Sequence, residues 1–212
     1  MASAIEVGVI DYGAGNVSSV MFALERAGVE AERVSTPEEI VRCDRLILPG
    51  VGAAHEAMHA LHEMNVIEAM HEAVHIKARP FLGICVGMQV LADRLTEFGE
   101  TEGLGWITGE VLPLSEIVTE PVHIPHMGWS RVTLTGRGEA WKKQIGSRTD
   151  FYFAHSFAMV PKDSAVIVAT AQHGGEVTAA VSSGTILATQ FHPEKSQLPG
   201  IMLMEAFVDW MP

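Results

Sequence analysis

The chain has 212 residues, of which 48% are apolar and 19% are charged, a balance typical of one globular domain spanning residues 1–212. Its 26 acidic residues outweigh its 14 lysines and arginines and give a formal charge of −12. This charge argues against nucleic acids and anionic membranes as partners, because both are negatively charged. No apolar run reaches the roughly 18 residues that a membrane span requires.

The chain contains two cysteines, Cys43 and Cys85, which are too few for a disulfide framework. The segment Met1–Glu6 lacks the basic residues and the long apolar stretch of a signal peptide. We therefore expect a cytoplasmic protein with reduced thiols.

The first half of the chain, up to about residue 93, alternates short apolar segments with helical patterns. The expected strands are Ile5–Ile10, Glu32–Val34, Arg45–Leu48 and Pro80–Ile84. The expected helices are Val17–Ala27, one beginning near Ser35–Glu39, and one or two within Ala53–Lys77. This alternation predicts right-handed crossovers and a mostly parallel sheet covered by helices on both faces.

The second half, after Gly99, is rich in β-segments separated by Gly, Ser and Pro. These segments are Val111–Leu114, Trp129–Leu134, Phe151–Val160, Ala165–Ala171, Val177–Val181 and Ile186–Gln190. The final segment, Leu198–Trp210, has a helical pattern with apolar residues on one face. The expected fold class is thus α/β, with additional antiparallel strands in the second half.

The strongest chemical signal is Gly83-x-Cys85-x-Gly87, between an expected strand and a helix-like run, Met88–Asp93. This is the cysteine form of the nucleophile elbow, in which the flanking glycines prevent collisions at a sharp strained turn. A thiol beside a helix N-terminus is favoured as the thiolate, which can attack a carbonyl carbon. The alternative is an ordinary buried cysteine, which is our interpretation of Cys43.

A nucleophilic cysteine needs a base and a group that orients the base. His192-Pro193-Glu194 follows an expected strand, and residues two apart in extended chain point to the same side. Glu194 could therefore hold one imidazole nitrogen of His192 and leave the other for the sulfur. Judged alone, His192 could equally be a surface loop histidine.

Together, Gly83-Ile84-Cys85-Val86-Gly87-Met88-Gln89 and His192-Pro193-Glu194 resemble the class I (triad) glutamine amidotransferase family. Further stretches are similar to the glutaminase subunits of imidazole glycerol phosphate synthases, in the order expected for them. They are Asp11-Tyr12-Gly13-x-Gly15-Asn16, Pro49-Gly50-Val51-Gly52, Ile124-Pro125-His126-Met127-Gly128-Trp129, Tyr152-Phe153-Ala154-His155-Ser156 and His192-Pro193-Glu194-Lys195-Ser196.

The resemblance implies a flavodoxin-like fold and hydrolysis of glutamine in histidine biosynthesis, without a cofactor or a metal. Cys85 would form a γ-glutamyl thioester, His192 would protonate ammonia and then activate water, and Glu194 would fix the imidazole tautomer. A separate TIM-barrel cyclase subunit would receive the ammonia and form a heterodimer with this chain.

The oxyanion of such a reaction needs two backbone N–H donors. The expected donors are Val86 and the turn Gly50-Val51-Gly52, while Gln89 and the Ser156 region would line the glutamine pocket. Candidate contacts with the partner are Asn16, His126 and Trp129. His126 could equally be a hydrogen-bonded loop residue, and Trp129 could be a core residue.

Three positions depart from the pattern of the family. Val86 stands where Leu is usual, Ser130 where Asn is usual, and Phe157 where Tyr is common. They concern the pocket and the partner face, and the triad itself is intact.

Two segments, His55–His59 and His71–His75, match the H-E-x-x-H pattern of zinc proteases. We interpret them as solvated helix faces, because one helical face does not complete a catalytic zinc site. In the first, Ala57, Met58, Leu61 and Val66 would face the sheet.

Three other functions remain open from the sequence. They are another triad glutaminase, serving chorismate or pyridoxal phosphate chemistry, a cysteine hydrolase on the same fold, and a non-catalytic docking subunit.

Overall fold

The computed structural model describes residues 5–138 and 150–212. Its main sheet has the strand order β2-β1-β3-β4-β13-β12-β11-β8-β9, and the first five of these strands are parallel. They are β1 (Val7–Ile10), β2 (Ala31–Val34), β3 (Arg45–Leu48), β4 (Phe81–Ile84) and β13 (Ile186–Thr189). This is the flavodoxin-like order 2-1-3-4-5, which confirms the predicted fold class.

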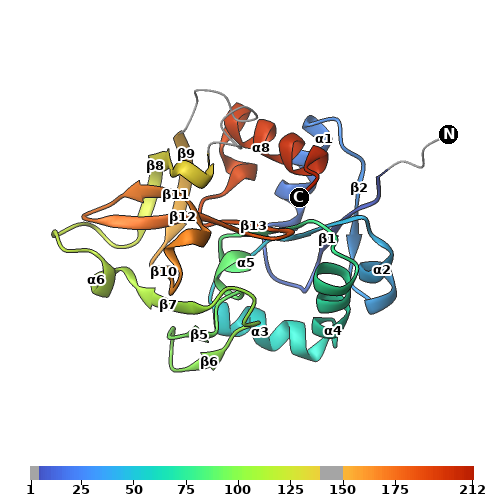
Figure 1. The fold of residues 1–212 in the computed structure, drawn as a ribbon, viewed down its shortest axis with the longest axis horizontal. Helices are drawn as coiled ribbons and strands as arrows, with labels where there is room; N and C mark the ends of the chain where they lie inside the picture. Colours follow the sequence, from blue (N-terminus) through green and yellow to red (C-terminus); the bar gives the residue numbers. More distant parts are fainter. Residues whose placement is uncertain (1–4, 139–149) are drawn as a thin grey trace.

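Antiparallel strands extend the sheet beyond β13 (Figure 1). They are β12 (Glu176–Ser183), β11 (Ile167–Gln172), β8 (His126–Leu134) and β9 (Asp150–His155). A second sheet has the order β10-β7-β5-β6, formed by β10 (Phe157–Pro161), β7 (Gly109–Pro113), β5 (Arg94–Leu95) and β6 (Thr101–Glu102). The expected strand content of the second half is confirmed.

Helices cover both faces of the parallel part of the main sheet (Figure 1). On one face, α1 (Val17–Arg26) packs against α8 (Gln197–Asp209). The other carries α3 (Ala54–Glu63) and α4 (Ile67–His71), which continues as a π-helical turn, Glu72–Ile76, and packs against α2 (Pro37–Arg42). The short α5 (Val86–Gln89) and α6 (Leu114–Ile117) follow β4 and β7. None of the helices in the described ranges is long and apolar enough to span a membrane.

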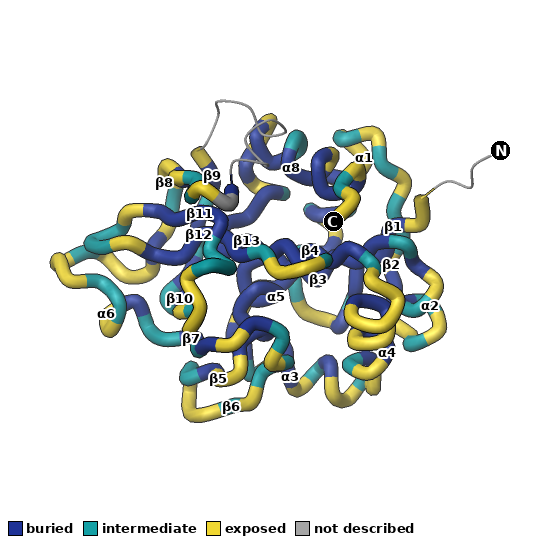
Figure 2. Tube along the Cα trace, viewed as in Figure 1, coloured by how far each residue is buried: buried dark blue, intermediate teal, exposed yellow. Residues whose placement is uncertain are grey.

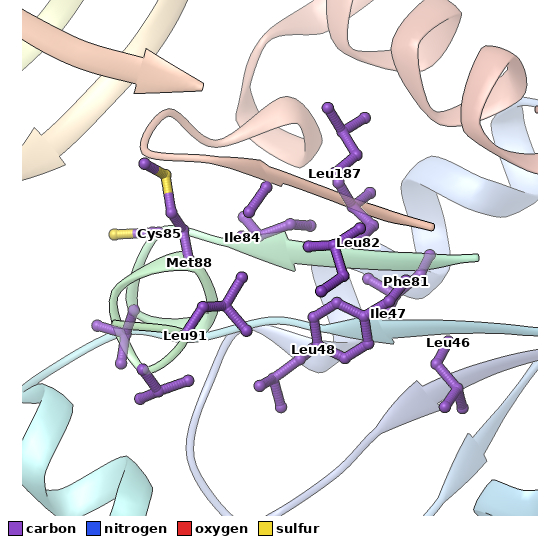
Figure 3. Packing of buried hydrophobic residues seen from close by; sticks show 14 of the residues in the cluster. Leu46, Ile47, Leu48, Phe81, Leu82, Ile84, Cys85, Met88, Leu91 and Leu187 are labelled. Atoms are coloured by element: carbon purple, nitrogen blue, oxygen red, sulfur yellow. The ribbon is translucent and has the colours of Figure 1, made fainter. Parts of the chain in front are cut away.

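The core lies along the central strands, where every residue of β1, β3, β4 and β13 is buried (Figure 2). Aliphatic side chains such as Leu46, Leu82 and Leu187 form one cluster there (Figure 3). Because parallel strands are buried on both faces, their sequences are nearly continuous apolar runs, which is why they could be predicted.

The helix after Cys85 is shorter than predicted, because α5 ends at Gln89 instead of continuing to Asp93. The carbonyl oxygens of Val90, Leu91 and Ala92 accept hydrogen bonds from backbone N–H groups of residues 104–107. Those carbonyls are therefore used by a distant segment and not by a longer helix. The sequence pattern around Met88–Asp93 contains no sign of this pairing.

The β-segment predicted at Phe151–Val160 is two strands in different sheets. β9 pairs with β8, whereas β10 pairs with β7, and Ser156 lies between them. The carbonyl of Ser156 accepts a hydrogen bond from the N–H of Leu114. The break therefore places Ser156 and its neighbours where the two sheets meet.

Candidate active site

Cys85 occupies a strained turn at the carboxyl end of β4. Its backbone has φ 54° and ψ −106°, a left-handed φ that non-glycine residues rarely adopt. A Cβ on Gly87 would lie 2.0 Å from the Leu48 carbonyl oxygen, and one on Gly83 would lie 2.6 Å from that of Gly87. Only glycine fits at either position, and the sulfur points away from the aliphatic cluster (Figure 3).

His192 reaches the thiol because β13 is the parallel neighbour of β4. The N–H of Cys85 donates to the Thr189 carbonyl at 2.7 Å, and the chain then leaves the sheet and enters a 3-10 turn, Pro193–Lys195. Within this turn His192 Nδ1 lies 2.7 Å from Glu194 Oε1, and both side chains are almost fully buried. Glu194 therefore reaches the imidazole through a turn, and not along extended chain as the spacing argument assumed.

The pair fixes the protonation pattern of the imidazole. A carboxylate only accepts hydrogen bonds, so Nδ1 of His192 carries a hydrogen and Nε2 is left for the thiol. Burial alone lowers the pKa of His192, but hydrogen bonds with Cys85 and Glu194 outweigh it and raise the pKa to about 9. His192 is thus held as an imidazolium near neutral pH by its hydrogen bonds with Glu194 and Cys85.

A cavity of about 320 Å³ opens over these residues. Its walls include many of the residues predicted from the sequence, namely Cys85, Val86, Gln89, Val51, Gly52, Ser156 and His192. Glu194 lies behind His192 and does not line the cavity. The volume suits a ligand the size of an amino acid.

The expected oxyanion donors lie beside the nucleophile. Val86 is the first residue of α5, so its N–H has no partner within the helix. A Cβ on Gly50 would lie 2.6 Å from the Gly87 nitrogen, so the Gly50–Gly52 turn packs directly on the elbow. Gly52 has φ +86°, a conformation that glycine adopts at little cost.

The predicted partner contacts differ in accessibility. Trp129 is 49% exposed on β8, and Asn16 is half-buried at the start of α1, where its Oδ1 accepts from Ser19 Oγ. His126 is only 2% exposed, so its ring cannot touch a partner directly. Its neighbour Met127, 65% exposed and part of the cavity wall, presents the apolar surface instead.

The class I glutamine amidotransferase profile matches residues 8–209 of this chain. A relative from Zymomonas mobilis subsp. mobilis, an imidazole glycerol phosphate synthase subunit HisH, is 46% identical over 97% of this chain and 96% of its own length. The HisH subunit of Caulobacter vibrioides is 44% identical over 97% of this chain and 99% of that protein.

The chain belongs to the class I glutamine amidotransferase family. This confirms the resemblance drawn from its motifs. The fold agrees, because PurLQS from Thermotoga maritima superposes with a TM-score of 0.74 at 18% identity, covering 98% of this chain and 99% of that one. A solved glutamine amidotransferase gives a TM-score of 0.71 at 21% identity, covering 96% and 99%.

Two charged residues of this amidotransferase line the cavity but were not predicted as site residues, namely Glu97 and Lys195. Glu97 also accepts a hydrogen bond from the N–H of Ala54, at the start of α3, through Oε2 at 3.1 Å. It lies in an irregular stretch after Leu95, where no periodic pattern marks it. Lys195 belongs to the stretch His192–Ser196 that carries the family resemblance, and its place directly after Glu194 was the available signal.

The remaining cysteine and the histidines of α3 lie outside the cavity. Cys43 is fully buried, and burial, together with the nearby Glu32 carboxylate, raises the pKa of its thiol to about 11. His59 and His62 are exposed on α3, whereas the positions predicted to face the sheet are buried, namely Ala57, Met58, Leu61 and Val66. Residues 5–138 and 150–212 contain no group of three or more His, Cys, Asp or Glu that could hold a metal ion.

Proposed function

We propose that this amidotransferase is the glutaminase subunit of an imidazole glycerol phosphate synthase in histidine biosynthesis, acting through Cys85, His192 and Glu194. The observation that carries the proposal is the buried His192–Glu194 pair beside a strained cysteine in a cavity of amino-acid size. The similarity to HisH subunits over nearly the full length supports this assignment within the family.

In the first half of the reaction the Cys85 thiolate attacks the carboxamide carbon of glutamine, and the carbonyl π electrons move to oxygen. The tetrahedral intermediate collapses as the C–N bond breaks and His192 gives its Nε2 proton to the departing nitrogen. Ammonia leaves and a γ-glutamyl thioester remains. His192 is suited to this step because its raised pKa keeps it protonated near neutral pH.

In the second half, neutral His192 takes a proton from water as the water oxygen attacks the thioester carbon. The C–S bond then breaks, glutamate leaves, and the thiolate–imidazolium pair is restored. Glu194 holds Nδ1 throughout, so Nε2 always faces the reacting atoms. The N–H groups of Val86 and of the Gly50-Val51-Gly52 turn would stabilise the oxyanion in both halves.

The α-ammonium of glutamine needs an anionic group in the pocket, and Glu97 supplies one in the cavity wall. Gln89 and Ser156 border the same cavity. We propose that Glu97 binds the α-ammonium group of glutamine and that Gln89 and Ser156 contact the rest of the substrate.

The ammonia would pass to a TIM-barrel cyclase subunit, which forms a heterodimer with this chain in the cytoplasm. Met127, Trp129 and Asn16 would contact it. Met127 lines the cavity, Trp129 is exposed on the same strand, β8, and Asn16 precedes α1 at the carboxyl end of β1. No cofactor or metal is required for this chemistry, and residues 1–212 would act as a single glutaminase domain.

The deciding experiment measures glutamate formation from glutamine by the purified chain, with and without the cyclase subunit of the same organism. We expect slow hydrolysis alone and marked stimulation by the cyclase. If a chorismate-using or pyridoxal-phosphate-forming partner stimulates hydrolysis instead, the chain is another triad glutaminase. If no partner brings about hydrolysis, the chain is a non-catalytic docking subunit.

A further inference from the structure

Two histidines outside the triad lie side by side in the interior. His126 opens β8, His155 closes β9, and the two residues are directly paired across the strands. They are 2% and 5% exposed, and His126 Nδ1 lies 3.1 Å from His155 Nε2. The ring of His126 is stacked between Phe153 and His173, at centroid distances of 4.5 and 4.1 Å. Such tightly held rings have a fixed orientation.

The hydrogen-bond partners determine where each hydrogen lies. His155 Nδ1 is 2.8 Å from the Phe157 carbonyl oxygen, which only accepts, so Nδ1 of His155 is the donor. In the neutral ring Nε2 is then an acceptor, and His126 must donate to it from Nδ1. The remaining nitrogen of His126, Nε2, therefore accepts from the Ser130 hydroxyl at 2.8 Å.

The same carbonyl connects this pair to the nucleophile. The Phe157 oxygen also accepts from Gln89 Nε2 at 2.9 Å, and the second hydrogen of that nitrogen points to Gln190 Oε1 at 3.1 Å. Gln190 Nε2 in turn lies 3.6 Å from Cys85 Sγ, within hydrogen-bonding range of sulfur. Gln89 and Gln190 are 3% and 0% exposed, so water does not compete for these bonds.

We propose that these groups form one ordered hydrogen-bond chain, the Ser130–Cys85 chain, in which His126, His155 and Gln190 are positioning residues for the glutaminase reaction. The inference rests on the proposed function. The Ser130–Cys85 chain holds Gln89 in place in the wall of the pocket. It also keeps an amide N–H of Gln190 on the sulfur of Cys85, where this N–H stabilises the thiolate.

His155 must be neutral for this order to exist, since a second hydrogen on its Nε2 would face the hydrogen on Nδ1 of His126. A second hydrogen on His126 would instead reverse its bond with the Ser130 hydroxyl, which can also accept. Burial lowers the pKa of His126 to about 4 and that of His155 to about 3, with neighbouring histidines adding to the effect. The titratable groups that face the pair are His173, from the turn between β11 and β12, and His192 of the triad. The chain therefore stays ordered across the physiological range.

Ser130 is the first member of the Ser130–Cys85 chain and lies on β8. The same strand carries the exposed residues Met127 and Trp129. The usual Asn of the family at position 130 would offer an amide N–H in place of the serine hydroxyl, so both residue types can donate to His126.

The test compares His155→Phe, which removes both ring nitrogens, with His155→Asn, whose amide can still donate near the Nδ1 position. The first readout is the rate at which iodoacetamide alkylates Cys85 at neutral pH, followed by mass spectrometry of the Cys85 peptide. Buried Cys43 serves as an internal reference for intact folding. The second readout is kcat and KM for glutamine with the cyclase present.

We expect His155→Phe to slow alkylation of Cys85 by about threefold to tenfold, the factor that loss of one net hydrogen bond supports, and to raise KM. His155→Asn should recover most of the alkylation rate. Ser130→Ala should slow alkylation in the same direction, Ser130→Asn should restore it, and Thr133→Ala, an exposed hydroxyl on the same strand, should match the unaltered protein.

If His155→Phe does not fold, the three substitutions at Ser130 and Thr133 decide the question. The proposal would be overturned if Cys85 in folded His155→Phe is alkylated at a rate within twofold of that in the unaltered protein. If only Ser130→Ala folds, the same criterion applies to that variant. If the alkylation rates of Cys85 follow this pattern but the protein hydrolyses no glutamine, the Ser130–Cys85 chain is supported and the proposed function is refuted. The two proposals can therefore fail separately.

Discussion

The two cysteines show how strongly local surroundings set the chemistry of one side chain. Both are almost completely buried, but Cys43 lies near Glu32, whereas Cys85 meets an imidazolium and the amide of Gln190. Cys85→Ala should therefore lower glutamine hydrolysis at least about a thousandfold, as removal of a nucleophile does in other triads. Cys43→Ala is the matched control and should retain turnover, and activity in Cys85→Ala comparable to the control would remove Cys85 from the mechanism.

The raised pKa of His192 predicts the alkaline limit of activity. A pKa near 9 means that the imidazolium persists well above the usual value of 6.5 and is lost as the pH rises through about 9. The pH profile of kcat/KM, which reports the free enzyme, should therefore fall above about pH 9. In Glu194→Gln the decrease in kcat/KM should begin at lower pH, because one of the two interactions that raise the pKa of His192 is weakened. An unchanged alkaline decrease would contradict this role of Glu194.

We expect Glu97 to affect the KM for glutamine more than kcat. Glu97→Gln preserves an acceptor for the Ala54 N–H but removes the charge proposed to meet the α-ammonium. We expect KM for glutamine to rise about tenfold or more, the size of a lost charged hydrogen bond, with a small change in kcat. Glu100→Gln, an exposed carboxylate of the same loop paired with Arg94, is the control. Equal KM values for the two variants would refute the assignment.

At the scale of elements, the contact between β3 and the elbow leaves no room for a methyl group. A Cβ on Gly87 would lie 2.0 Å from the Leu48 carbonyl oxygen, so Gly87→Ala must displace a strand or the nucleophile. We expect a loss of at least about 2 kcal/mol and a Tm lower by roughly 4–8 °C. Gly136→Ala, where a Cβ would meet nothing within 4 Å, should leave the Tm nearly unchanged.

The elements that could be predicted from sequence are those with a local cause. The apolar runs of β1, β3 and β4 mark buried strands, and Thr36 with Glu39 forms the capping box that begins α2. The early end of α5 and the break at Ser156 could not be predicted, because they depend on backbone partners in residues 104–107 and in Leu114. Long-range pairing of this kind leaves no periodic pattern.

The same distinction holds within the site. The proximity of Cys85, His192 and Glu194 was predictable because glycine spacing, strand ends and family resemblance coincide there. Glu97 and Gln190 reach the site only through folding. His126 was predicted as a contact with the partner, but its ring lies inside, where β8 pairs it with His155.

For the whole molecule, the proposed docking face near the cavity makes a prediction about association. Trp129→Ala should weaken binding of the cyclase by about 2 kcal/mol, or roughly thirtyfold in Kd, as expected for a central aromatic contact. Ile76→Ala is the control, because Ile76 is 72% exposed and lies in the segment before the amino end of β4, whereas the cavity lies at the carboxyl end of that strand. Isothermal titration calorimetry with the cyclase measures both, and equal affinities would place the interface elsewhere.

The position of β13 between β4 and β12 has a consequence for how the protein matures. β13 is the fifth parallel strand and also the link to the antiparallel strands. During synthesis Cys85 emerges long before residues 186–194, so the growing chain carries its thiol without the histidine that we propose activates it. Pairings between such distant segments are intrinsically slow to form. The thiol and the histidine therefore meet only when the last parallel strand has inserted between β4 and β12 and joined both halves of the sheet.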